Sequence, residues 1–236
     1  GKGVLYLYGN YAGDVMNFKI AAQLAAAEGI KVETVLIWDD VASAQPSTKE
    51  DRRGIAGLIP IVKIAGAAAD KAKDLDELVS LVTSARDNTR SVGVALSPGS
   101  IPATGKPTFE LDDDSIGIGM GIHGEQGVGI EKMMPADDLA EKLLNLILAD
   151  DLILESGDDV LVLINSLGST TMMECLIVLK KVKALLVDKG IKIYDVMLGP
   201  LVTCQEMAGL SISLTKGDDT LKPLWDAPCS LGYTKL

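Results

Sequence analysis

The sequence predicts an α/β fold of two α/β sub-domains with mixed, mostly parallel sheets flanked by helices. Short apolar runs alternate with longer segments of helical periodicity along the 236 residues. This alternation is typical of βαβ units with parallel strands. Hydrophobic residues make up 47% of the chain and aromatic residues only 4%, so we expect a core of aliphatic side chains.

The first half of the chain, residues 1–90, predicts a strand–helix–strand unit followed by two further helices. Asp14 stands at the start of the first helical run, where an N-cap residue is expected, and Gly29 ends that run. The connections around the run are short, so the two strands should be parallel. The expected elements are strands over 3–10 and 31–40, helices over 12–29, 55–72 and 75–89, and a polar loop over 41–54.

The second half, residues 91–236, predicts the other sub-domain. A strand over 90–98 runs into the Pro- and Gly-rich link 98–109, and we place a domain boundary near 88–97. The remaining expected elements are an extended segment over 115–123, helices over 136–150 and 171–190, and strands over 158–169, 191–200 and 209–217.

The composition disfavours several classes of partner and location. A net charge of −11 argues against nucleic acid, because displacing counterions from phosphates needs a basic surface. No run approaches the roughly 20 apolar residues of a membrane span. Cys175, Cys204 and Cys229 are far apart without CxxC spacing, which disfavours disulfides and favours the cytoplasm. The chain begins with Gly-Lys-Gly, so we expect it to belong to a longer polypeptide.

The single histidine, His123, lies in the segment 117–132 among six glycines. Either the segment is a turn with an incidental histidine, or the glycines clear space for a group that His123 holds. Residues 119–124 fit GxGxxG, but the second strand and acidic residue of a dinucleotide site do not follow. A Ser–His–acid triad lacks its GxSxG motif, and a metal site lacks a second histidine one helical turn away.

Three groups of polar residues follow predicted strands, where open α/β sheets bind ligands. Asp14 is either part of a site or only the N-cap of its helix. Asp39 and Asp40, with the charged residues 51–53 nearby, either contribute to a site or lie in a solvated loop. Residues 165–169 either line a site or form an ordinary strand-to-helix connection. The residues alone leave these alternatives open.

Six short motifs carry a family resemblance. In chain order they are GNYAGDVMNF (9–18), DRRGIAG (51–57), GKPTFEL (105–111), GMGIHGEQG (119–127), INSLG (164–168) and LWDAP (224–228). Together they resemble the substrate-binding K domain of dihydroxyacetone kinases, over essentially the whole chain. The combination of GIHGE with NYxGDxxNF makes this resemblance specific.

The resemblance implies a role for each matched site residue. His123 would form a covalent hemiaminal with the ketone carbon of dihydroxyacetone or a similar short ketose. Asp14 would be the base for the hydroxyl that receives the phosphoryl group. Gly13, Gly121 and Gly124 are implied as substrate-binding positions, where bare backbone approaches a small ketose. A covalent tether would position the substrate and reject glycerol, which has no ketone.

The sequence departs from the family pattern at three places. Gly9 stands where the family often has lysine, which suggests room for a larger ketose such as erythrulose, and Gln126 stands where proline is common. The family's N-terminal segment with its GGGSGHEP loop is not in this sequence. We therefore expect residues 1–90 to be the C-terminal part of the first domain of the K fold, and residues 91–236 to be the second domain.

The family implies that this chain binds no cofactor itself. ADP or ATP with Mg²⁺ would be carried by a separate nucleotide-binding subunit, which in bacteria can be rephosphorylated by a phosphotransferase system. K subunits are typically homodimers. The alternative within the family is a non-catalytic, ketose-sensing co-activator, which would bind ketose without forming product. A structural histidine in an unrelated α/β protein is the third possibility, and the presence of Asp14 favours the kinase.

Overall fold

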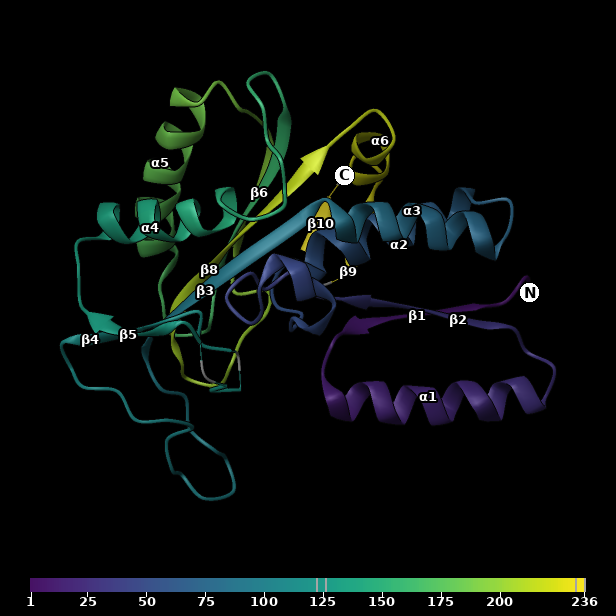
Figure 1. The fold of residues 1–236 in the computed structure, drawn as a ribbon, viewed down its shortest axis with the longest axis horizontal. Helices are drawn as coiled ribbons and strands as arrows, with labels where there is room; N and C mark the ends of the chain where they lie inside the picture. Colours follow the sequence, from purple (N-terminus) through teal and green to yellow (C-terminus); the bar gives the residue numbers. More distant parts are fainter. Residues whose placement is uncertain (122, 126, 232, 236) are drawn as a thin grey trace.

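The N-terminal unit is the predicted strand–helix–strand. The structure, a computed structural model, describes residues 1–121, 123–125, 127–231 and 233–235. In it β1 (Val4–Gly9) and β2 (Val32–Ile37) pair in parallel, connected by α1 (Ala12–Ala27). The ring of Phe18 stacks on Tyr8, which holds α1 against β1. Figure 1 shows this unit at one end of the molecule, with α1 beside the two strands.

A larger sheet fills the centre of the molecule, with its described strands in the order β5-β4-β3-β8-β6-β7. The pair β6–β7 is parallel, and the other four neighbouring pairs are antiparallel. The sheet is therefore mixed as expected, but it differs from the mostly parallel arrangement, because β8 inserts between β3 and β6 and opposes both. The bounds are β3 (Thr89–Ser97), β4 (Ser115–Ile118), β5 (Gly129–Lys132), β6 (Asp159–Ser166), β7 (Lys192–Gly199) and β8 (Ala208–Gly217).

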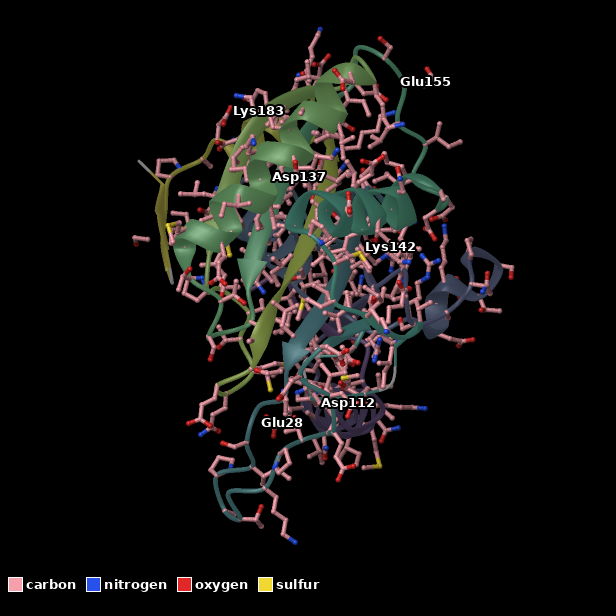
Figure 2. All side chains as sticks on the ribbon, turned by 90° about the vertical axis from the view of Figure 1, so that its left-hand side faces the viewer. Glu28, Asp112, Asp137, Lys142, Glu155 and Lys183 are labelled. Carbon is pink, nitrogen blue, oxygen red and sulfur yellow. The ribbon has the colours of Figure 1, made fainter. Side chains whose placement is uncertain are left out.

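Helices cover both faces of this sheet, as the α/β class predicts. On one face lie α4 (Ala136–Leu148) and α5 (Met172–Asp188), whose apolar sides pack with the strands in the largest core cluster. Figure 2 looks onto these two helices, with charged side chains such as Lys142 and Lys183 on their outer side. The opposite face is covered by α2 (Leu58–Lys71), α3 (Leu75–Asp87) and α6 (Leu221–Trp225).

One hydrophobic core joins the two halves of the chain. Ile37 of β2 and Ile61 of α2 belong to the same buried cluster as Leu163 of β6 and Trp225 of α6. Helices α2 and α3 therefore pack against both sheets. The division into residues 1–90 and 91–236 stays a prediction.

The polar segment 41–54, expected to be a loop, contains the short 3₁₀ helix η1 (Pro46–Asp51) and a buried ion-pair network. Arg52, fully buried, donates from both Nη atoms to the two carboxylate oxygens of Asp150, at 2.9 and 2.6 Å. Arg90, also buried, donates to Asp150 and to Asp151. This network ties the segment to the strand β3 and to the end of α4.

The helix ends differ in detail from the sequence expectations. The N-cap of α1 is Tyr11, so Asp14 lies in the first turn of the helix rather than at the cap. Helix α5 begins with a capping box between Thr171 and Glu174. The C-terminal tail was expected to complete the large sheet, but it forms a separate antiparallel pair, β9 (Cys229–Leu231) and β10 (Tyr233–Lys235). Within the described residues, every helix is too short or too polar to cross a bilayer.

Candidate functional site

His123 lies in a folded turn between β4 and β5. Gly119 N donates to Gly93 O of the neighbouring strand at 2.7 Å, which fixes the start of the turn. Inside it, Gly121 N donates to Glu125 O at 2.9 Å, and Gly124 N donates to Gly121 O at 3.0 Å. The His123 side chain is 64% exposed, so it is accessible from solvent. Gln126, where the family often has proline, falls outside the described residues.

Glu125 holds both the backbone and the ring of His123. Its Oε2 accepts from His123 N, and its Oε1 lies 2.9 Å from His123 Nδ1. Burial raises the pKa of Glu125, but hydrogen bonds from the His123 ring and from backbone N–H groups outweigh this and lower it. An ionised carboxylate can only accept hydrogen bonds, so Nδ1 carries the proton. The lone pair of a neutral His123 is then on Nε2.

Tyr11, at the N-terminus of α1, contacts the ring of His123. Its ring meets that of His123 edge-on, with centroids 5.2 Å apart and an interplanar angle of 81°. Its hydroxyl donates to Gly54 O at 2.9 Å. Burial, followed by the nearby Glu125 carboxylate, raises the pKa of Tyr11, so the phenol stays protonated. The carboxyl end of β1 therefore faces the His123 turn.

Asp14 lies one helical turn after Tyr11, exposed in the first turn of α1. Its charge adds to burial in raising the pKa of Tyr8. Among the hydrogen bonds of the described residues, none joins Asp14 to His123. Asp14 thus lies at the start of α1 and His123 in the turn that faces it, and the Tyr11 ring makes the contact between this helix and this turn.

The three glycines implied as substrate-binding differ in their surroundings. A Cβ at Gly121 would lie 2.1 Å from Glu125 Oε2 and 2.7 Å from Arg53 Nη1. Gly124 has a φ of +85°, and a Cβ there would lie 3.1 Å from the ring of Phe109. The positive φ therefore makes glycine the favoured residue at Gly124, whereas a side chain at Gly121 would displace the Glu125 carboxylate that holds His123. A Cβ at Gly13 would meet nothing within 4 Å, so that position stays a prediction from the resemblance.

Gly9 is enclosed by its neighbours. A Cβ there would lie 3.2 Å from the Tyr11 ring and 3.4 Å from Gly54 O. A side chain at Gly9 would thus press against the Tyr11 ring and the backbone of Gly54, and the room for a larger ketose beside Gly9 stays a prediction.

Asp40 lies in a buried cluster rather than in a solvated loop. Its Oδ2 accepts from Arg53 Nε at 3.1 Å and from Nη2 at 2.7 Å, and its Oδ1 accepts from Ala42 N. Arg53 Nη2 also donates to Gly119 O at 2.9 Å, at the start of the His123 turn. Burial raises the pKa of Asp40 to about 6, although the Arg53 guanidinium opposes that rise.

Asp39 is also buried, and its oxygens accept from Ile55 N at 2.9 Å and Gly57 N at 2.8 Å. Burial raises its pKa, and a hydrogen bond with Ser91 acts in the opposite direction. Asp39 therefore fixes the backbone that enters α2. The solvated-loop alternative is wrong for both aspartates, because backbone N–H groups and Arg53 satisfy them inside the fold.

The raised pKa of Asp40 predicts a pH-dependent stability. Because the folded value, about 6, exceeds the ordinary value of about 3.9, protonating Asp40 favours the folded state. This contribution is fully present below about pH 4 and is lost as the pH rises through about 6. We expect the free energy of unfolding of the wild type to fall by about 2–3 kcal/mol over that range, relative to Asp40→Asn. Urea unfolding of both proteins at several pH values measures this difference. If the two free energies of unfolding change with pH in parallel, the prediction is refuted.

Residues 165–169 form a strand-to-helix connection, which was the alternative to their lining a site. Asn165 is buried, and its Oδ1 accepts from Leu201 N and Val202 N while its Nδ2 donates to Val202 O. Ser166 Oγ donates to Thr170 O. These bonds organise the loops that follow β6 and β7.

Sequence reasoning did not single out two residues that contact His123. Glu125 and Tyr11 both lie inside the motifs GIHGE and NYxGD, two residues after the histidine and three before Asp14. The signal for Glu125 was a carboxylate close to the chain's single imidazole. Nothing in the spacing indicated that Tyr11 would reach across to a residue more than a hundred positions away.

Comparisons with known proteins agree with the resemblance. A family model described as the Dak1 domain matches residues 1–232. The dihydroxyacetone-binding subunit of PTS-dependent dihydroxyacetone kinase 2 from Listeria innocua is 44% identical over 236 residues, which are 100% of this chain and 70% of that protein. L-erythrulose 1-kinase from Mycolicibacterium smegmatis is 38% identical over 231 residues, covering 97% of this chain and 40% of that enzyme.

A solved structure has a closely similar fold. A dihydroxyacetone kinase operon co-activator superposes with a TM-score of 0.88 at 31% identity, covering 97% of this chain and 70% of that one. The matches extend over both halves of the sequence and include the His123 turn. The chain therefore belongs to the Dak1 domain family, which is the family of the dihydroxyacetone-binding kinase subunits that its motifs indicated.

Proposed function

We propose that this chain binds dihydroxyacetone covalently through His123 and presents it for phosphorylation by a nucleotide-carrying partner. The observation that carries the proposal is the His123–Glu125 pair, in which the carboxylate holds the Nδ1 proton and leaves the Nε2 lone pair available. The Listeria relative, whose name describes a dihydroxyacetone-binding subunit, supports the choice of ketose.

The addition step balances with the groups of this turn. The Nε2 lone pair of His123 forms a bond to the ketone carbon, and the π electrons of the carbonyl move to its oxygen. That oxygen takes a proton from water, and the Nδ1 proton passes through Glu125 to the hydroxide that this water leaves. The hemiaminal is therefore neutral, and the Glu125 carboxylate and the water molecule are both regenerated. Glu125 orients the ring and accepts the proton that addition makes acidic.

Asp14 is the group that we propose as base for the phosphoryl acceptor. Its carboxylate is exposed at the N-terminus of α1, on the element that Tyr11 brings to His123. It would take the proton of a ketose hydroxyl as that oxygen attacks the phosphoryl group. Phosphoryl transfer otherwise needs positioning and charge stabilisation, which the covalent tether and the partner's nucleotide with Mg²⁺ would supply. We further propose a cytoplasmic homodimer, with no nucleotide held by this chain.

Two other functions have specific support. The similarity to an L-erythrulose 1-kinase favours a longer ketose, and the similarity to an operon co-activator favours a sensor without catalysis. Asp14 supports the kinase, since a sensor needs the covalent histidine but not a base. The chain spans 70% of the Listeria subunit and 40% of the erythrulose kinase, so substrate and activity are both part of this proposal.

A reconstitution distinguishes the three. The protein is mixed with a nucleotide-binding subunit of a dihydroxyacetone kinase loaded with ATP and Mg²⁺, and phosphorus NMR follows product from dihydroxyacetone or L-erythrulose. We expect dihydroxyacetone phosphate as the main product. A faster reaction with L-erythrulose would reassign the substrate. Binding of ketose without product from either would favour the sensor.

A further inference from the structure

Residues 50–54, here the bridge segment, lie against the ends of β1 and β2. Asn10 Nδ2 donates to Glu50 O at 2.9 Å and to Arg52 O at 2.8 Å, and the Tyr11 hydroxyl donates to Gly54 O. A Cβ at Gly54 would lie 2.6 Å from Gly9 Cα, so the backbones are in direct contact. The bridge segment therefore supports the residues that lead into α1 and Asp14.

The same segment reaches the His123 turn through one side chain. Arg53 donates to Asp40 Oδ2 and to Gly119 O, and its Nη1 lies beside Gly121. Gly119 and Gly121 stand four and two residues before His123. Arg53 is thus in contact with the same part of the turn as the Glu125 side chain.

The neighbouring arginine fixes the bridge segment to the body of the protein. Arg52 is fully buried, with its guanidinium paired to Asp150 and its Nε donating to Ala44 O at 2.8 Å. Arg53 N also donates to Ser43 Oγ at 3.0 Å. These bonds leave little freedom for the backbone from which Arg53 extends.

We propose that Arg53, held by Asp40, is a positioning residue that sets the place of His123 relative to the N-terminus of α1. The inference rests on the proposed covalent role of His123 and extends it to residues that touch no substrate. One segment bonds to both sides of the site: through backbone carbonyls to Asn10 and Tyr11, and through the Arg53 guanidinium to the His123 turn.

Arginine is suited to this role because its planar guanidinium donates in several fixed directions. Arg53 uses Nε and Nη2 toward Asp40, and Nη2 again toward Gly119 O. A lysine ammonium could pair with Asp40, but as a compact point charge it would not reproduce these directions together. Arg53→Lys therefore keeps the charge and removes the geometry.

The experiment compares Arg53→Lys and Asp40→Asn with wild type, using Arg86→Lys as control. Arg86 lies on α3 and pairs with its sequence neighbour Asp87. The first readout is the NMR spectrum of ¹⁵N-labelled histidine, which gives a single imidazole because the chain has one histidine. The second is the equilibrium between free and adduct-bound dihydroxyacetone, and the third is product formation with the nucleotide-loaded partner.

We expect Arg53→Lys to change the His123 imidazole resonances and to weaken adduct formation and turnover by at least about tenfold. Asp40→Asn should change the same signals in the same direction, and Arg86→Lys should match wild type. If Arg53→Lys and Asp40→Asn fold and leave the imidazole spectrum unchanged, Arg53 is not a positioning residue. If wild type forms no adduct while the imidazole still responds to Arg53→Lys, the proposed function fails and the positioning role stands.

Discussion

Replacing Asp14 with asparagine is expected to reduce the rate of phosphoryl transfer by about 10²–10⁴, the usual contribution of a positioned general base. Asparagine has nearly the same shape but cannot accept the proton of the ketose hydroxyl. Adduct formation at His123 should persist, because Asp14 makes no hydrogen bond to the described residues of the His123 turn. The measurement is product formation by the reconstituted kinase, with the adduct fraction determined on the same sample.

A matched control separates chemistry from helix stability. Asp137 lies in the first turn of α4, as Asp14 does in α1, and both are exposed. Each carboxylate interacts with its helix dipole, a contribution of about 0.3–1 kcal/mol. Asp137→Asn should therefore match Asp14→Asn in stability and match wild type in turnover. Turnover by Asp14→Asn within about threefold of wild type would exclude Asp14 as the base, given the size of such contributions.

Replacing Asp150 with alanine is expected to lower the free energy of unfolding by about 3–5 kcal/mol, because it leaves buried charges uncompensated. Asp150 is the carboxylate that both Arg52 and Arg90 share, and those side chains are 0% and 1% exposed. Urea unfolding measures the effect.

An exposed ion pair gives the comparison for Asp150. Asp76, whose side chain is 79% exposed, pairs with Lys31 at 2.7 Å on the surface. Removing it should cost no more than about 1 kcal/mol, as for other surface pairs. Equal losses for Asp150→Ala and Asp76→Ala would mean that burial of the Arg52 network contributes nothing to stability.

The parts of the fold that depend on local pattern could be predicted from the sequence. The parallel β1–α1–β2 unit follows from short connections, and α3 and α4 follow from helical spacing of their apolar residues. The antiparallel character of the large sheet could not be predicted in this way. It depends on β8 inserting between β3 and β6, and pairing over such separations leaves no local signal.

In the candidate site, too, some residues could be predicted from the sequence and others depend on contacts between distant segments. His123 and Asp14 could be named because motifs carry them, and Glu125 lies in the same motif as His123. The sequence left open whether Asp40 belongs to a site or to a solvated loop, because its burial depends on contacts with Arg53 and with strand β3. Gly121 and Gly124 could be assigned to the turn, but whether they face a ketose or the chain's own Glu125 and Phe109 required coordinates.

Carbon NMR with the ketone carbon of dihydroxyacetone labelled with ¹³C, on protein labelled with ¹⁵N only at histidine, tests the covalent role of His123 most directly. The chain has one histidine, so any nitrogen–carbon coupling assigns the bond without ambiguity. The account predicts a new tetrahedral carbon signal split by ¹⁵N, present in wild type and lost in His123→Ala. A labelled carbon that stays ketone or simple hydrate at saturating ketose, with no coupling to nitrogen, would contradict it.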